Sequence, residues 1–147
     1  MKLFKLFIIL LLVGIVSGCG KDIIREGNGD LIIEYNYGPT YGTKEDVENR
    51  YIINVYDNKT VEYGYKNDEK KTKDIDSETY QKLINEVFSD SFLKLDEDVS
   101  NTDIVDGGSS EVILHLEDGS TKKIGGANST NKRYNKVEDM LKKLKED

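Results

Sequence analysis

The stretch SETYQKLINEVF, residues 77–88, decides what kind of fold this chain can adopt. Its apolar residues recur at the spacing of one helix face; they are Tyr80, Leu83, Ile84, Val87 and Phe88. Ser77 precedes this stripe, and we expect it to cap the helix N-terminus, because serine hydroxyls readily accept a bond from the first free amides. A helix cannot bury such a stripe alone, so we expect it to pack against a sheet.

Three segments before this helix are rich in β-branched and aromatic residues, which favours strands. They are Leu31 to Tyr37 (LIIEYNY), Tyr51 to Tyr56 (YIINVY) and Thr60 to Tyr65 (TVEYGY). A second hairpin follows the helix, with strands at Val112 to Leu116 and Thr121 to Ile124 and a turn at Asp118-Gly119.

Loop length decides which side chains share a face in these hairpins. A two-residue loop would turn the apolar stripes to opposite faces, so we expect three-residue connections with a one-residue bulge. This register would align Val55 with Tyr63 and Leu114 with Ile124.

The final segment, Lys132 to Lys145, repeats the helical pattern with Tyr134, Val137, Leu141 and Leu144. The predicted order is βββ-α-ββ-α. An antiparallel sheet of about five strands with both helices on one face buries these stripes most simply, so the predicted class is α+β.

The first residues, MKLFKLFIILLLVGIVSGCG, have the layout of a secretory signal. Lys2 and Lys5 precede an apolar run from Leu6 to Val16, and this run is shorter than the roughly 20 residues that cross a bilayer. We therefore expect residues 1–18 to be removed.

The sequence Val16-Ser17-Gly18-Cys19 resembles the bacterial lipobox, the motif of signal peptidase II substrates. The resemblance implies a lipoprotein cut before Cys19, with diacylglycerol and palmitate-type chains on that cysteine, held at the extracytoplasmic face of the cell membrane. Residues 19–30 would then be the lipidated N-terminus and a short linker with a reach of about 35 Å, and residues 31–147 one domain. The alternative is an ordinary secretory signal followed by an unrelated cysteine.

Removal of residues 1–18 leaves 129 residues in which Cys19 is the only cysteine, so no disulfide can form within the domain and packing alone must hold it. Loss of Lys2 and Lys5 leaves 19 basic against 28 acidic side chains, a net charge of −9. Such an acidic surface argues against nucleic acid as a partner.

The rest of the chain is similar to small domains of bacterial lipoproteins. The likeness lies in the Tyr- and Val-rich hairpin, the helix that opens Ser77-Glu78-Thr79-Tyr80, the Asp-rich loop, the Asp-Gly hairpin and the terminal helix. These motifs are structural, and the resemblance implies no activity.

Catalytic motifs are absent from the sequence. His115 is the only histidine, and alternation with Leu114 and Leu116 places it on the outer face of its strand. There is no G-x-S-x-G motif and no phosphate-binding loop that ends in Lys-Ser or Lys-Thr. We therefore predict no enzyme, no catalytic residue and no cofactor.

The loop from Asp96 to Ser110 (DEDVSNTDIVDGGSS) is rich in oxygen ligands. It does not fit the EF-hand, because Asn101 stands where Gly is required and Gly107 where a bidentate Glu is required. No metal is assigned; an irregular calcium loop and a solvated connection both stay open.

Two loops at one end of the second hairpin form a predicted binding rim. A hairpin brings the loop before its first strand next to the loop after its second, and glycines let a partner approach the backbone closely. The candidate residues are Asp103, Asp106, Gly107, Gly108, Ser109, Gly125, Gly126 and Asn128, with Tyr41 as a separate aromatic contact. The alternative is that these residues only form turns.

The function that we expect is a membrane-anchored binding or interaction module for an unknown protein or glycan. An accessory, structural or inhibitor-like subunit of a membrane complex is the alternative, and a surface hydrolase is a distant third. The nine tyrosines suit either sheet packing or an aromatic surface that stacks on glycan.

Overall fold

A computed structural model describes residues 22–103 and 107–146 of the chain. Six strands form one antiparallel sheet in the order β4-β3-β2-β1-β5-β6. The strands are β1 (Leu31–Pro39), β2 (Tyr51–Tyr56), β3 (Thr60–Tyr65), β4 (Lys71–Asp74), β5 (Gly108–His115) and β6 (Thr121–Ala127). The helices are α2 (Lys44–Glu48), α3 (Ser77–Val87), α4 (Asp90–Leu93) and α5 (Lys132–Lys143).

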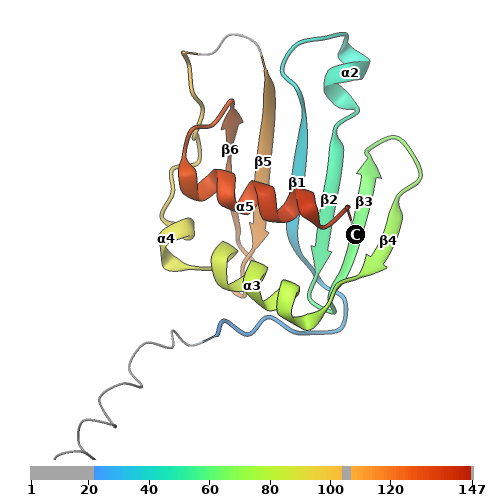
Figure 1. The fold of residues 1–147 in the computed structure, drawn as a ribbon, viewed down its shortest axis with the longest axis vertical. Coiled ribbons are helices and arrows are strands. Elements are labelled where there is room, and N and C mark those ends of the chain that lie inside the picture. The colour runs from blue at the N-terminus through green and yellow to red at the C-terminus, as the bar shows by residue number, and fades with distance from the viewer. Residues whose placement is uncertain (1–21, 104–106, 147) are drawn as a thin grey trace, which may run out of the picture.

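The two long helices, α3 and α5, lie on the same face of the sheet (Figure 1). This confirms the predicted α+β class with an antiparallel sheet. The predicted counts were too low, because the described residues form six strands and four helices rather than about five and two. Among the described residues, neither long helix covers the opposite face of the sheet, which is called the open face below.

The core lies between the helices and the sheet, as the helical stripes predicted. Leu83, Ile84 and Val87 of α3 are at most 1% exposed, and they meet strand residues such as Ile53. The terminal helix buries Tyr134, Val137 and Leu141 in the same way. Complete burial of these stripes fixes which face of the sheet the helices cover.

The cap of α3 differs from the prediction by one residue. Asp76, and not Ser77, is the N-cap, because its carboxylate accepts hydrogen bonds from the amides of Glu78 and Thr79, each at 2.9 Å. Ser77 is the first helical residue. These bonds lower the pKa of Asp76, which ties the carboxylate charge to the start of the helix.

The β2–β3 loop has the expected three residues, and the Leu116 amide donates to the Ser120 carbonyl at 2.9 Å, so three residues also form the tip between β5 and β6. The predicted partners, however, were wrong. Val55 pairs with Val61 rather than with Tyr63, and Ile124 pairs with Val112 rather than with Leu114. Each loop lies one residue earlier than expected, so every pair shifts by two residues and the apolar faces still agree. Lys59 (φ 70°) and Gly119 (φ 83°) take the left-handed conformation at the third loop position.

The elements that were missed are short or polar. β4 reads KTKD and has no apolar alternation, so only its pairing with β3 defines it as a strand. α2 and α4 are single turns set by local caps, Thr43 with Asp46 and Ser89 with the Phe92 amide. None of them carries a stripe long enough to be seen in sequence.

The predicted signal sequence and Cys19 lie outside the described residues. Within residues 22–103 and 107–146, no helix has the length and apolar character needed to cross a membrane. Residues 22–30, which we expected to form a linker, run along the end of the sheet where α3 lies (Figure 1).

Candidate functional site

The open face of the sheet carries a groove of about 730 Å³. Its floor comes from β1, β2, β5 and β6, and residues 97–98 border it beside β6. Its lining begins in the middle of β1, at Glu34, and extends toward the end of the sheet opposite residues 22–30.

Strand alternation places a polar set of side chains in this groove. On β1, Ile33 and Tyr35 are buried beneath the helices, so Glu34 and Asn36 face the opposite way. Ile52 and Asn54 on β2 take the same side, since Ile53 is buried in the core. The groove floor thus combines polar side chains with the apolar side chain of Ile52.

Arg50 organises one end of the groove. Its Nε donates to Asn36 Oδ1 at 2.9 Å, and its terminal nitrogen donates to the Ser109 hydroxyl at 3.0 Å and to the Ser109 carbonyl. Lys66 lies next to it, because the Lys66 amide donates to the Arg50 carbonyl at 2.8 Å. This end of the groove is therefore positively charged.

Carboxylates define the other end. Residues 97–101 run along the edge of β6; the Gly125 amide donates to Glu97 O at 2.9 Å and the Val99 amide donates to Gly125 O at 3.0 Å. The exposed side chains of Glu97 and Asp98 border the groove here. Bonds from Ser100 lower the pKa of Asp98 and favour its charged form. At this same end, Lys123 of β6 forms an ion pair with Glu111 of β5.

His115 lies on the open face, as its strand position predicted. Its Nε2 is 2.7 Å from Glu34 Oε1, and both side chains are about one-third exposed, at 35% and 37%. His115 lies at the end of β5 closer to residues 22–30 and does not line the groove, although its partner Glu34 does. Its imidazole is therefore already engaged by a carboxylate.

The structure brings most of the predicted rim together at the far end of the sheet. Ser109 pairs with Ala127, and the Asn128 amide donates to Gly108 O at 3.1 Å. Gly125 lies at this end also, opposite Glu111. The Asp103 amide bonds Asn101 Oδ1 at 3.0 Å in the preceding loop. Asp106 lies outside the described residues.

The rim glycines allow other residues of the chain to pack closely against their backbone. A Cβ on Gly126 would lie 2.4 Å from Ser100 Oγ, and one on Gly107 would lie 1.8 Å from Asn128 Oδ1. These distances are far below normal contact, so the space beside each glycine is already filled. Tyr41, in contrast, is 64% exposed at this end of the molecule.

Most strand tyrosines face the helices and pack on one another. The ring centroids of Tyr37 and Tyr51 are 5.3 Å apart, and those of Tyr51 and Tyr65 are 5.1 Å apart. Lys145 lies 4.6 Å from the Tyr51 centroid and donates to the Tyr37 hydroxyl at 2.6 Å. Tyr37 and Tyr51 therefore serve packing and cation–π contacts, while Tyr65 remains 51% exposed.

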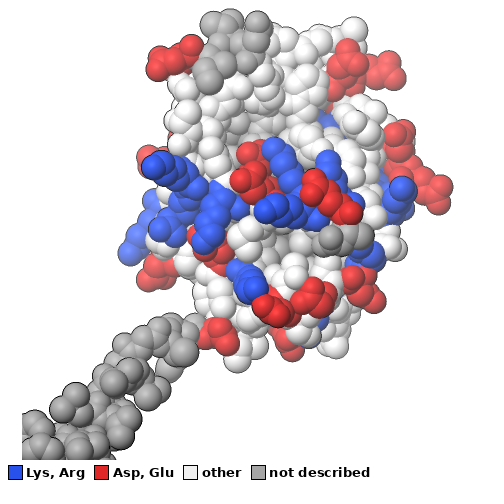
Figure 2. Space-filling view, viewed as in Figure 1, with Lys and Arg blue, Asp and Glu red and all other residues white. Residues whose placement is uncertain are grey.

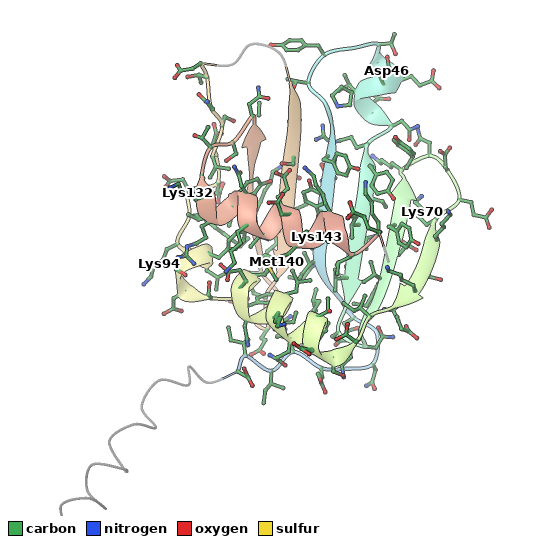
Figure 3. The ribbon with its side chains drawn as sticks, viewed as in Figure 1. Asp46, Lys70, Lys94, Lys132, Met140 and Lys143 are labelled. Carbon is green, nitrogen blue, oxygen red and sulfur yellow. The ribbon has the colours of Figure 1, made fainter. Side chains whose placement is uncertain are left out.

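The outer side of the helices is covered with charges of both signs (Figure 2). Glu86 of α3 pairs with Arg133 and Lys136 of α5, which joins the two helices. Lys132 and Lys143 are exposed on α5, and the half-buried Met140 lies between them in sequence (Figure 3). A shallow hollow here is formed only by α5 side chains.

Sequence reasoning missed the groove. The signal was present as polar residues alternating with buried ones, at Glu34 and Asn36 and again at Asn54. What the sequence could not show was that β1 lies between β2 and β5, which places these residues beside Glu111. Arg50 precedes its strand and gave no signal.

Within the described part of the chain, no group of three or more His, Cys, Asp or Glu side chains is placed to hold a metal ion. A scan against protein-family models found no match, and neither did searches of curated proteins and of solved structures.

Proposed function

We propose that this chain is a lipid-anchored extracytoplasmic protein of the cell envelope, and that its domain is a non-catalytic module that binds another protein through the open-face groove. The observation that carries the proposal is the groove itself. It combines cations held at one end, carboxylates at the other and an apolar floor at Ile52. The anchor is proposed from the lipobox resemblance around Cys19.

The arrangement of charge favours a polypeptide partner. Arg50 and Lys66 attract a carboxylate, while Glu97 and Asp98 attract a lysine or arginine, so the complement carries both signs. A glycan without charge offers neither. Among the described lining residues the only aromatic one is Tyr35, whose hydroxyl bonds Glu138 on the helix side, so the groove offers no ring for sugar stacking.

The pairing of the groove residues supports a binding role rather than catalysis. The Ser109 hydroxyl receives a hydrogen bond from the Arg50 guanidinium, which cannot act as a general base. His115 is engaged by Glu34 and lies outside the groove. Arg50 is held by three bonds, which lowers the entropy cost of meeting a charged partner.

A charge-swap experiment tests this function. A photo-crosslinking amino acid at Ile52 should capture a discrete partner in cells that produce the full chain. The double variant Lys66→Glu with Glu97→Lys keeps the net charge but reverses the two ends of the groove, and it should abolish that crosslink.

The matched control exchanges an ion pair far from the groove, Glu78→Lys with Lys82→Glu on α3, where the two side chains are 2.6 Å apart. This control should leave the crosslink intact. A crosslink that survives reversal of Lys66 and Glu97, in protein that remains folded, would contradict the groove as the binding site.

A further inference from the structure

Residues 22–30, here named the strap, are fixed to the domain by hydrogen bonds at their first residues. The Ile23 amide donates to Asn85 Oδ1 at 2.9 Å, and Gln81 Nε2 donates to the Ile23 carbonyl at 2.7 Å. Asn85 Nδ2 also donates to Asp22 Oδ1 at 2.9 Å. The strap is therefore tied to α3 from its first described residue.

Arg25 holds the middle of the strap. Its guanidinium donates to the His115 carbonyl at 2.8 Å and lies 4.6 Å from the centroid of the Phe88 ring. Its own carbonyl accepts a hydrogen bond from the Tyr80 hydroxyl. Burial raises the pKa of Tyr80 to about 12, so this donor stays protonated at any physiological pH.

The last part of the strap is held by the β2–β3 turn. Asp57 Oδ1 accepts from the amides of Gly29 and Asp30 at 2.7 and 2.9 Å, and the Asp57 carbonyl accepts from Gly27 at 3.2 Å. A Cβ on Gly27 would lie 1.9 Å from Asp57 Oδ2, so only glycine allows this approach. The strap is thus held against one end of the sheet by hydrogen bonds at its start, middle and end.

The distance from the proposed anchor to the strap is very short. Only Gly20 and Lys21 separate Cys19 from Asp22, so these Cα atoms can lie at most about 10 Å apart. The headgroup layer of each leaflet is about 5 to 8 Å deep. If Cys19 is lipidated, Asp22, the first residue of the strap, therefore lies within about the length of one residue from the headgroup layer.

We infer that the strap end of the domain lies against the lipid headgroups in a fixed orientation, with Ile24 in the membrane interface. This inference rests on the proposed lipidation of Cys19. Ile24 is 76% exposed, while its neighbours Ile23 and Arg25 turn toward the domain. Tyr41 follows the far end of β1, about 30 Å away along the strand, so it and the groove end face outward.

Charge attraction does not supply this contact. The strap carries the carboxylates of Asp22, Glu26 and Asp30 against the single cation of Arg25, and Glu26 pairs with Lys59 at 3.1 Å. This end therefore offers no excess of positive charge to anionic lipids. The short tether and the insertion of the exposed Ile24 side chain into the membrane interface set the orientation, which is expected to persist in zwitterionic lipid at high salt.

Fluorescence quenching in vesicles tests the orientation. The full lipidated chain is reconstituted in phosphatidylcholine vesicles that contain nitroxide-labelled lipid. Because the thioether would block Cys19, a cysteine introduced by Ile24→Cys or by Tyr41→Cys is the only free thiol and takes an environment-sensitive dye. The dye at position 24 should shift to the blue and be quenched, and the dye at position 41 should show neither effect.

A strap variant separates orientation from anchoring. Gln81→Ala with Asn85→Ala removes the bonds to Ile23 and leaves Cys19 intact. Vesicle binding should be unchanged, while the difference in quenching between positions 24 and 41 should shrink. Equal quenching at both positions in lipidated parent protein, or an unchanged difference in the strap variant, would overturn the fixed orientation while leaving the anchor in place. Absence of lipid on Cys19 would overturn the anchor itself, and this orientation with it.

Discussion

The hydroxyl of Tyr35 on β1 donates a 2.7 Å hydrogen bond to Oε1 of Glu138 on α5, which joins the central strand to the terminal helix. Tyr35 is fully buried, and the Glu138 side chain is 17% exposed. Lys142 Nζ lies 3.1 Å from the same oxygen of Glu138. The carboxylate is therefore bonded from the sheet and from its own helix.

Removal of this bond should destabilise the domain. Tyr35→Phe keeps the ring and removes only the hydroxyl, so the free energy of unfolding should fall by about 1.5 to 3 kcal/mol, the range for a hydrogen bond to a charged group. Denaturant unfolding measures this change. Tyr41→Phe is the control, because the Tyr41 ring is exposed, and it should leave the stability unchanged.

Stability should also depend on the charge of Glu138. Burial alone would raise the pKa of this carboxyl, but hydrogen bonds from Tyr35, Ser110 and Lys142 outweigh burial and hold the pKa below the ordinary 4.5. Because the pKa of Glu138 is lower in the folded protein, its ionised carboxyl contributes stability at pH values above 4.5. This contribution is lost as the pH falls through the pKa of the folded state.

Comparison with Glu138→Gln isolates this contribution. The parent should be more stable than the variant at neutral pH, and the difference in unfolding free energy should shrink as the pH falls below 4.5. Denaturant unfolding at a series of pH values gives the two curves. Curves that stay parallel through the acid range would show that Glu138 carries no such shift.

The α3 stripe should be the most sensitive part of the core. Leu83 is 1% exposed, so Leu83→Ala should cost about 2 to 5 kcal/mol through lost burial and a cavity. Lys82→Ala, one residue away on the exposed side, is the matched control and should change stability by less than about 0.5 kcal/mol. A small effect at Leu83 would mean that α3 turns another face to the sheet.

The close contact between β6 and residues 97–101 can be tested by adding one methyl group. Gly126→Ala places a Cβ 2.6 Å from the Ser100 amide nitrogen, so residues 97–101 should move away from β6. The amides of Val99 and Asn101, which bond Gly125 and Ala127, should then lose protection from hydrogen exchange.

Gly119→Ala is the comparison for this experiment. Its Cβ would meet nothing within 4 Å, but its φ of 83° is strained for alanine by about 1 to 2 kcal/mol. Global stability should therefore fall without selective loss of protection at Val99 and Asn101. Retained protection of those two amides in Gly126→Ala would contradict the packing described here.

The sequence was sufficient to predict the features that depend on the regular spacing of apolar residues. The stripes of α3 and α5 and the alternation of the two hairpins were sufficient for the α+β class, because burial of those residues admits few arrangements. Register was missed by two residues in both hairpins. In the first, Lys59 rather than a glycine or asparagine takes the left-handed position; in the second, Gly119 takes it, but the turn lies one residue earlier than expected. No residue preference indicates the choice of Lys59.

The groove and the strap could not be predicted, because both depend on contacts between distant residues. Glu34 and Glu111 share a face only once β1 pairs with β5. The strap looked like a linker because its residues are polar and glycine-rich, yet Asp57 binds three of its backbone amides. The composition of residues 22–30 does not indicate that Asp57, distant in sequence, binds them.

The state of Cys19 tests the central claim most directly. Cells that produce the full chain are labelled with a palmitate analogue, and the N-terminal peptide of the purified protein is identified by mass spectrometry. We predict that the chain begins at Cys19 and carries diacylglycerol, and that Cys19→Ser abolishes the label. A parent protein that starts elsewhere or carries no lipid, or a Cys19→Ser variant that is processed and retained like the parent, would contradict the account.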